Sequence, residues 1–294
     1  MKLLVTGANG QVGRELVKQG KQEVVGLGRE ALDITNRAAV RRAVEQHAPD
    51  VVVNAAAYTA VDRAEDEPER AHSVNCDGPA HLAEACADTG IPLVHISTDY
   101  VFDGERGSPY TERDAVNPLG VYGQSKWAGE EAVRKHLDRH VILRTSWVFG
   151  AYGANFVRTM LRLMRERDVV RVVDDQWGNP TAAADIAHAI LQVARQIEQR
   201  DEVRWGTFHF AGQPAATWHG FAEAILEEAR RHGSVRVESV EPIPTSAYST
   251  AAPRPADSRL DCSRFAEIWG TEAPPWRPAL RAVVSSLATQ SSEP

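Results

Sequence analysis

The first half of the chain alternates short apolar runs with longer amphipathic stretches. The runs are rich in Val, Ile and Leu and cover residues 2–7, 23–28, 51–57, 92–98 and 140–146. Helical patterns begin near residue 12, at 37–47, at 68–87 and after residue 120. Apolar runs of this length, separated by helices, are typical of parallel strands buried on both faces. The pattern therefore predicts an α/β fold with a doubly wound parallel sheet of the Rossmann type.

The pattern loosens after residue 148. Amphipathic helices are predicted at 155–167, 183–196, 218–231 and 278–287, with short strands and Pro-rich loops between them. We expect a dinucleotide-binding domain at 1–150 and a smaller substrate-binding lobe over most of 151–294, with some segments returning to the first domain. The segment "EPIPTSAYSTAAPRPADSRL" suits a loop over the carboxyl edge of the sheet, although a disordered linker is the alternative. The tail 288–294 is expected to fray.

Composition narrows the classes of function. The chain has 294 residues, a formal net charge of -7, 43% hydrophobic and 25% charged residues. An acidic balance argues against a general nucleic-acid binder and leaves room for a local cationic pocket. No apolar run approaches a membrane span, and the first residues do not resemble a signal peptide. The three cysteines lack CxxC spacing, so neither a disulfide framework nor a zinc site is predicted, and we expect a cytoplasmic protein.

A glycine-rich turn follows the first apolar run. "VTGANGQVG" places Gly7, Gly10 and Gly13 between a predicted strand and a predicted helix. Glycine permits a tight turn and lets the backbone approach a pyrophosphate, which then lies at the helix N-terminus. This context, and not the spacing alone, predicts a dinucleotide site.

The end of the second run bears on the choice of cofactor. It leads into Gly28 and Arg29, and an arginine at this position accommodates the 2′-phosphate of NADP, whereas an acid would bind the ribose hydroxyls of NAD. We therefore predict NADPH, with NADH still possible; a plain surface arginine is the alternative. Asp33 and Ile34 are candidates to flank the adenine, although Asp33 could equally cap the next helix.

Candidate catalytic groups follow the fourth run. Thr98 ends that strand, and the stretch "VYGQSKWAGE" places Tyr122 and Lys126 four residues apart, on one face of a helix. We expect Thr98 to hydrogen-bond a substrate carbonyl and Tyr122 to donate a proton to the developing alkoxide. Lys126 is expected to lower the pKa of the tyrosine and to contact the nicotinamide ribose.

These motifs, taken together, resemble those of the extended short-chain dehydrogenase/reductases. Within that superfamily the chain is similar to the dTDP-4-dehydrorhamnose reductases, through "GANGQVG", "DVVVNAAAYTAVDRAE", "STDYVFDG", "NPLGVYGQSKWAGE", "RTSWVFG", "NFVRTML", "DDQWGNPT" and "RPADSRLD". The resemblance implies reduction of the C4 ketone of dTDP-4-dehydro-L-rhamnose by NADPH, with Thr98, Tyr122 and Lys126 as the catalytic residues.

The predicted binding residues form two groups. Besides Tyr122 and Lys126, the cofactor group comprises Gly7, Asn9, Gly10, Gln11, Val12, Gly13, Arg29, Asp33, Ile34 and Ala57. The resemblance implies that Ala55, Ala56 and Thr59 also line the cofactor. The resemblance places near the sugar nucleotide Asp99, Tyr100, Val101, Trp147, Asn155 and Arg254. An acidic protein needs a local cation for the substrate pyrophosphate, and Arg254 or Arg259 could supply it. Trp147 could stack on a ring or simply pack in the core.

Several alternatives remain open. A dehydratase would need an acid as its general base where this chain has Tyr100, so the sequence lacks the base that a dehydratase requires. A 4-epimerase uses the same three catalytic residues, and a regulatory subunit like the beta subunit of methionine adenosyltransferase would keep the fold without turnover. Some relatives dimerise through acids that bind a divalent metal. Glu15 matches one such position, but "TAAAD" does not clearly supply its partner, so Mg²⁺ stays uncertain, no metal ligand is predicted and a homodimer is possible.

Overall fold

A six-stranded parallel sheet forms the larger part of the molecule, in the order β10-β5-β4-β3-β1-β2. The computed structural model describes residues 1–200, 202–233 and 235–290. The strands are β1 (Leu3–Thr6), β2 (Val24–Leu27), β3 (Val51–Asn54), β4 (Leu93–Thr98), β5 (His140–Thr145) and β10 (Gly206–His209). The five apolar runs all form strands, and the predicted fold class is confirmed. The third strand is shorter than predicted, ending at Asn54, and β10 was not predicted because its sequence, GTFH, contains no run of apolar residues.

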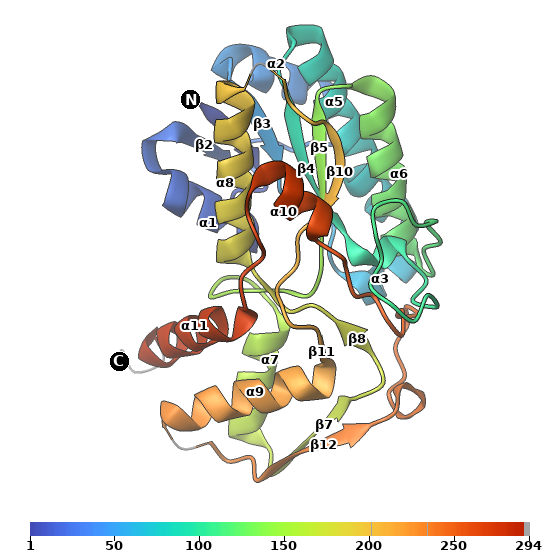
Figure 1. The fold of residues 1–294 in the computed structure, drawn as a ribbon, viewed down its shortest axis with the longest axis vertical. Coiled ribbons are helices and arrows are strands. Elements are labelled where there is room, and N and C mark those ends of the chain that lie inside the picture. The colour runs from blue at the N-terminus through green and yellow to red at the C-terminus, as the bar shows by residue number, and fades with distance from the viewer. Residues whose placement is uncertain (201, 234, 291–294) are drawn as a thin grey trace.

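Helices cover both faces of this sheet (Figure 1). Leu3 and Val5 face one layer, whereas Leu4 and Val52 face the other, because successive side chains of a strand point to opposite sides. The first layer contains α1 (Gln11–Gly20), α8 (Ala183–Gln199) and α10 (Ser263–Trp269). The second contains α2 (Arg37–His47), α5 (Gly78–Thr89) and α6 (Val121–His136). Within the described residues, no helix is long and apolar enough to cross a membrane.

A smaller lobe lies below the sheet in Figure 1 and has its own apolar core. Its helices are α7 (Phe156–Glu166), α9 (Trp218–Arg231) and α11 (Trp276–Gln290). Its two-stranded sheets pair β7 (Val169–Val173) with β12 (Ser239–Ile243), β8 (Trp177–Gly178) with β11 (Ala216–Thr217), and β6 (Val148–Phe149) with β9 (Thr181–Ala182). Of the tail expected to fray, residues 288–290 continue α11, and residues 291–294 lie outside the described part of the chain.

The helix predicted at 68–87 is divided in the structure. It consists of α4 (Pro68–His72), a π-helical turn at Ser73–Asp77, and α5. The turn directs the buried side chain of Asn75 inward, where its Oδ1 accepts from Tyr58 N at 2.8 Å and its Nδ2 donates to Ser125 Oγ at 3.0 Å. Insertions of this kind often lie at functional sites. Here the turn ties α6 to the segment after β3.

The Pro-rich segment 241–260 is a packed crossing strap, not a disordered linker. It pairs with β8, where Trp177 N donates to Ala256 O at 2.8 Å and Ser258 N donates to Trp177 O at 2.9 Å. It also reaches the larger lobe, where Tyr110 N donates to Arg259 O at 2.7 Å. Beyond β12 and a 3₁₀ turn at Thr245–Ala247, these backbone bonds take the place of the regular secondary structure that proline disfavours.

A buried carboxylate fixes α6 against the sheet. Glu130 is fully buried and accepts from Arg144 Nε at 2.9 Å, Arg144 Nη2 at 2.7 Å, Arg134 Nη2 at 2.7 Å and Ser97 Oγ at 2.5 Å. Burial alone would raise the pKa of Glu130, but Arg144 and Arg134 hold it below its usual value. The contacts join α6 to β4 and β5, and so set the position of Tyr122 and Lys126.

We predict that Glu130→Gln lowers the free energy of unfolding by roughly 3 kcal/mol or more at pH 7, because it leaves a buried arginine without its counter-charge. Denaturant unfolding measures the difference. A group with a depressed pKa stabilises the fold above its unfolded pKa, and this contribution is lost as the pH falls through the folded pKa. The gap between the two proteins should therefore narrow in acid. Glu131→Gln, at an exposed partner of Arg134, is the control and should change stability little. Equal stability of Glu130→Gln and the parent would contradict the prediction.

Candidate active site

The glycine turn fits closely against the segment that follows β3. Gly7 has a φ of 69°, and a Cβ there would lie 2.5 Å from Ala56 N. A Cβ on Gly13 would lie 2.2 Å from the Gly7 carbonyl oxygen. Gly10 is the N-cap of α1, so no capping side chain occupies the N-terminal amides of that helix. This is the geometry that binds a pyrophosphate at a helix N-terminus.

The side chains of Gln11, Val12 and Asn155 are turned toward protein. Val12 packs in the core beneath the sheet. Asn155 Nδ2 donates to Gln11 Oε1 at 2.9 Å, while its Oδ1 accepts from Arg158 N at 3.1 Å and caps α7. Asn155 is thus part of the joint between the two lobes, a role that the sequence pattern did not reveal.

Arg29 lies beside the glycine turn. The side chain of Asn9 packs on Gly28, where a Cβ would approach Asn9 Nδ2 to 2.4 Å. Arg29 is exposed and its Nε lies 4.0 Å from Asp33 Oδ2. A cation in this position remains accessible to a phosphate at the end of β2.

The structure excludes the alternative that Asp33 caps the next helix. Asp33 accepts from Thr35 N at 3.0 Å, and Asn36 caps α2 by accepting from Ala39 N at 3.0 Å. Asp33 is therefore not the helix cap. Ile34 is buried in the core and packs against Gly78, where a Cβ would lie 2.5 Å from Ile34 Cδ1.

The segment after β3 borders the same edge of the sheet. Ala55 N donates to Thr6 O at 3.2 Å, which keeps the chain extended as it leaves the strand. Ala55, Ala56 and Ala57 are half-buried and Thr59 is exposed.

Thr98 and Asp99 form a buried pair at the end of β4. Thr98 Oγ1 donates to Asp99 Oδ1 at 3.1 Å and accepts from Tyr100 N at 3.2 Å. Ser146 Oγ donates to Asp99 Oδ2 at 2.9 Å. Burial raises the pKa of Asp99 to about 6. Asp99 thus lies among hydroxyl groups behind Thr98 and orients them.

Tyr122 stands beside Thr98 at the start of α6. Burial raises the pKa of Tyr122 to about 12, hydrogen bonding from Thr98 opposes that rise, and the charge of Asp99 adds to it. The expectation that Lys126 lowers this pKa is wrong for the observed arrangement. Lys126 Nζ is turned toward β4, where it donates to Ile96 O at 2.7 Å, and burial lowers its own pKa to about 8.

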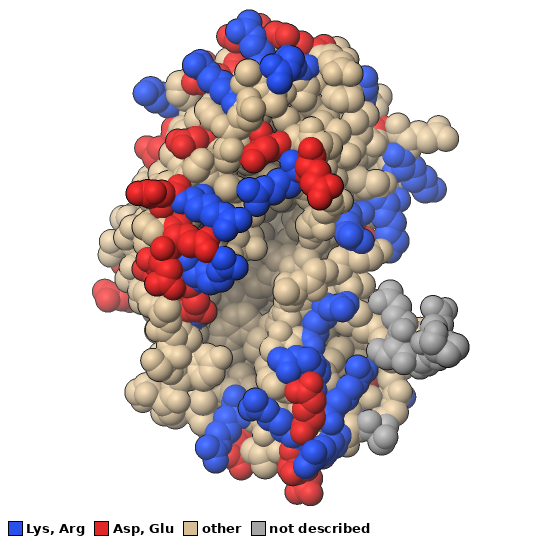
Figure 2. Space-filling model, turned by 180° about the vertical axis from the view of Figure 1, so that it is seen from behind, with Lys and Arg blue, Asp and Glu red and all other residues tan. Residues whose placement is uncertain are grey.

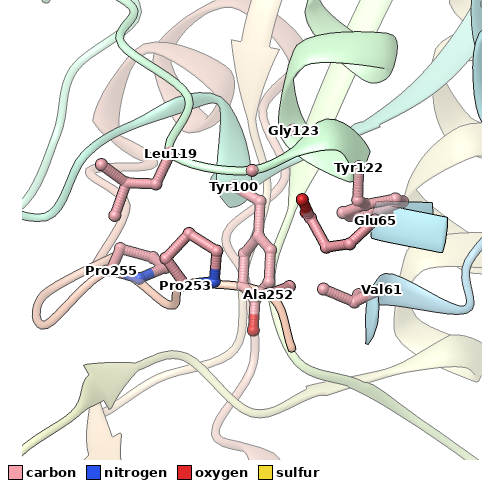
Figure 3. Close-up of a pocket in the computed structure, with 10 residues that line it drawn as sticks. Val61, Glu65, Tyr100, Leu119, Tyr122, Gly123, Ala252, Pro253 and Pro255 are labelled. Carbon is pink, nitrogen blue, oxygen red and sulfur yellow. The ribbon is translucent and has the colours of Figure 1, made fainter. Parts of the chain in front are cut away.

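A small pocket opens beside Tyr122 (Figure 3). Tyr100 forms one wall, with its ring centroid 5.8 Å from that of Tyr122 and the rings at 77°. The strap closes another wall through residues 252–255. The full lining is Val61, Glu65, Tyr100, Leu119, Gly120, Tyr122, Gly123, Ala252, Pro253 and Pro255. Val101, by contrast, is fully buried in a separate apolar cluster with Phe102.

Arg254 is held by an acid that the sequence patterns did not single out. Its Nη1 and Nη2 donate to Asp62 Oδ1 and Oδ2 at 2.8 and 2.7 Å. Asp62 lies on α3 (Val61–Asp66), and Glu65 of the same helix accepts from Val121 N at 2.9 Å. The two acids of α3 therefore hold the strap and the start of α6 together. Their "VDRAE" spacing reads as an ordinary solvated helix, so only the fold reveals their partners.

Trp147 is covered on both faces. Its ring stacks on Trp218 at 3.5 Å with an interplanar angle of 7°, and Gly178 lies against the ring, where a Cβ would approach Trp147 Cε2 to 2.3 Å. The backbone of Trp147 has a φ of 44°. The structure therefore matches the alternative that this indole packs in the core, where it helps to fix the small lobe against the end of β5.

Comparisons with known proteins place this geometry in a family. The model described as "RmlD substrate binding domain" matches residues 1–289. A dTDP-4-dehydrorhamnose reductase of Aggregatibacter actinomycetemcomitans is 44% identical over 287 residues, covering 96% of this chain and 98% of that protein. The chain belongs to the dTDP-4-dehydrorhamnose reductase family.

Solved structures agree with this assignment. A dTDP-4-dehydrorhamnose reductase of Clostridium acetobutylicum superposes with a TM-score of 0.90 at 38% identity, covering 98% of this chain and 99% of that one. The Bacillus anthracis reductase, solved in complex with NADP, gives a TM-score of 0.89 at 35% identity, covering 97% and 100%. The resemblance drawn from the motifs is thus confirmed over the whole fold.

The surface of this family member is hollowed between its two lobes. On the side opposite to Figure 1, Lys and Arg side chains are interspersed with Asp and Glu around the hollow (Figure 2). An acidic chain with a net charge of -7 therefore still presents cations beside a cleft. Such local charge is what an anionic ligand requires.

A metal-bridged dimer receives no support from Glu15 in this reductase-family chain. Glu15 is buried, with Lys18 Nζ at 3.7 Å and Gln19 Nε2 at 3.4 Å. Within residues 1–200, 202–233 and 235–290, no group of three or more His, Cys, Asp or Glu side chains stands together as a metal site. A homodimer stays a prediction.

Proposed function

We propose that this chain reduces the C4 ketone of dTDP-4-dehydro-L-rhamnose to give dTDP-L-rhamnose, with NADPH as the preferred reductant. The observation that carries the proposal is that Thr98 and Tyr122 lie side by side at the carboxyl edge of the sheet. Beside them is a pocket whose lining comes from the larger lobe and from the strap. In open α/β folds this edge is where ligands bind.

The protein groups have distinct roles in this proposal. Tyr122, whose raised pKa keeps it protonated near neutral pH, donates its proton to the oxygen at C4. Thr98 hydrogen-bonds the same oxygen when its hydroxyl turns from Asp99 toward the substrate. The turn from Gly7 to Gly13, with the N-terminus of α1, binds the pyrophosphate of the cofactor, and Arg29 binds the 2′-phosphate. NADPH supplies the hydride.

Two other functions would use the same fold. A 4-epimerase would return the hydride to its substrate and consume no NADPH, and a regulatory subunit would show no turnover. Purified protein with the 4-keto sugar and NADPH distinguishes them. Stoichiometric oxidation of NADPH and formation of dTDP-L-rhamnose support the reductase. Turnover of the sugar without net oxidation would favour the epimerase. No turnover, with tight association to a second enzyme, would favour the regulatory subunit.

We predict that Tyr122→Phe lowers kcat by roughly 10²–10⁴-fold, the usual contribution of general acid catalysis. The ring remains and only the proton donor is lost, so the affinity for NADPH should barely change. Steady-state kinetics and a fluorescence titration with NADPH measure the two quantities. Parental kcat in this variant would remove Tyr122 from the mechanism.

A second prediction concerns the substrate diphosphate. Arg254→Ala should raise KM for the sugar nucleotide about tenfold or more, because one charge-assisted contact of ~1.5–3 kcal/mol is lost. Cofactor affinity should stay unchanged, since the glycine turn lies elsewhere in the crevice.

Two matched variants test the cause of that change. Arg254→Ala also frees the carboxylate of Asp62, so Asp62→Asn is needed to separate lost attraction from new repulsion. In the Asp62→Asn background, where no freed carboxylate remains, Arg254→Ala should still raise the sugar KM. Arg259→Ala is the second matched variant. It removes another cation of the strap, one that pairs with Asp257. Weaker NADPH binding with an unchanged sugar KM in Arg254→Ala would show that Arg254 does not bind the diphosphate.

The third prediction concerns cofactor choice. Arg29→Asp should reduce kcat/KM with NADPH more than with NADH, because it replaces a phosphate partner by a repulsive charge. Arg41→Asp, an exposed change on α2, is the control for net charge. An unchanged ratio of the two kcat/KM values would leave Arg29 an ordinary surface residue.

A further inference from the structure

A chain of buried polar side chains leads from β1 to Lys126. Thr6 Oγ1 donates to Asn54 Oδ1 at 2.7 Å, and Asn54 Nδ2 lies 3.0 Å from His95 Nδ1. His95 Nε2 in turn lies 3.5 Å from Lys126 Nζ. All four side chains are buried, so they depend on one another, and not on bulk water, for hydrogen bonds. Of these four groups, only Lys126 is among the catalytic residues predicted from the sequence.

One backbone amide fixes the direction of the whole chain. Ala56 N donates to Asn54 Oδ1 at 3.1 Å. Because a backbone N–H can only donate, this oxygen must be the acceptor, and Asn54 Nδ2 must donate to His95 Nδ1. His95 Nδ1 therefore carries a lone pair. A neutral imidazole then has its proton on Nε2, the nitrogen that faces Lys126.

The imidazole is neutral in this setting. Burial lowers the pKa of His95 well below its usual value, and the charge of Arg134 acts in the same direction. A neutral ring with hydrogen on Nε2 presents a donor to Lys126 Nζ. An uncharged amine can accept from it, whereas an ammonium has no lone pair and would set donor against donor.

We propose that His95, held in its Nε2–H tautomer by Asn54, is a positioning residue that disfavours the ammonium form of Lys126. The donation from Lys126 Nζ to Ile96 O is available to an amine and to an ammonium, so it does not decide between them. The charged groups around Lys126 are few. Glu130, one turn further along α6, raises the pKa of Lys126, but Arg144 and Arg134 already bind its carboxylate.

The consequence for the proposed reductase is a lysine that exchanges protons near neutral pH. A group is most effective in proton transfer when its pKa lies near the working pH. After each reduction Lys126 would take a proton from solvent and pass it, as the ammonium, to the Tyr122 phenolate, which becomes a phenol again while Lys126 returns to the amine. This role rests on the proposed function, whereas the protonation state of Lys126 does not.

The chain offers a direct measurement, because it contains only five lysines, Lys2, Lys18, Lys21, Lys126 and Lys135. Lysine labelled with ¹³C at Cε gives five resonances, and the one missing in Lys126→Arg belongs to Lys126. Titration of the intact protein reports its pKa without substrate or turnover. In the parent we expect Lys126 to titrate below the other four. In His95→Gln the amide oxygen can accept from the ammonium, and the pKa should rise by about one pH unit.

His140→Gln is the matched control. His140 is a second largely buried histidine on the neighbouring strand, and its Nδ1 contacts Leu137 O instead of Lys126. The His140→Gln variant should leave the pKa of Lys126 unchanged. An unchanged pKa in His95→Gln, or an equal rise in both variants, would overturn the proposal.

A second measurement on the parent keeps the proposal testable if His95→Gln does not fold. The ¹⁵N spectrum of the assigned His95 ring should show a protonated Nε2 and an unprotonated Nδ1. A protonated Nδ1, or an imidazolium, would overturn the tautomer assignment. Failure of the reductase assay, with these spectra as expected, would reject the proposed function and leave the inference about Lys126 standing.

Discussion

The position of the candidate catalytic helix depends on one buried carboxylate. Glu130 binds Arg144 and Ser97 on adjacent strands and Arg134 on its own helix, so α6 cannot rotate or slide on the sheet without leaving a charge unpaired. Breaking such a buried pair is strongly destabilising, even though a pair of this kind adds little net stability over an apolar core. The network thus specifies one placement of α6. Tyr122 lies two turns before Glu130 on the same helix and Lys126 one turn before it, so the network also fixes the positions of these two residues.

The second constraint is the contact between the lobes. The short helix α3 uses Glu65 to bind the first amide of α6 and Asp62 to bind Arg254 of the strap. Asn155 and Gln11 make a separate joint at the glycine turn. The Asp62–Arg254 and Gln11–Asn155 contacts each join a segment of the larger lobe to a segment from beyond residue 150. The pocket beside Tyr122 therefore exists only when both lobes are in place.

The sequence predicted what depends on local pattern. The apolar runs predicted the five main strands, and the glycine spacing predicted the turn before α1, because period and turn chemistry are encoded by neighbouring residues. The short strand β10 and the π-turn at Asn75 were not predicted, because neither has a periodic pattern of apolar residues in the sequence. Trp147 was a candidate for stacking on a ligand, yet Trp218, some 70 positions along the chain, covers it. The pKa of Tyr122 was mispredicted for a related reason: spacing places Lys126 on the same face, but His95 and Ile96 determine where its amino group points.

The central claim is that the site beside Tyr122 delivers a hydride to a sugar ketone. The most direct test uses NADPH with deuterium at the transferable position of the nicotinamide and dTDP-4-dehydro-L-rhamnose as substrate. The account predicts dTDP-L-rhamnose with one deuterium at C4 and none elsewhere on the sugar. Product without deuterium, or label at another carbon, would contradict it.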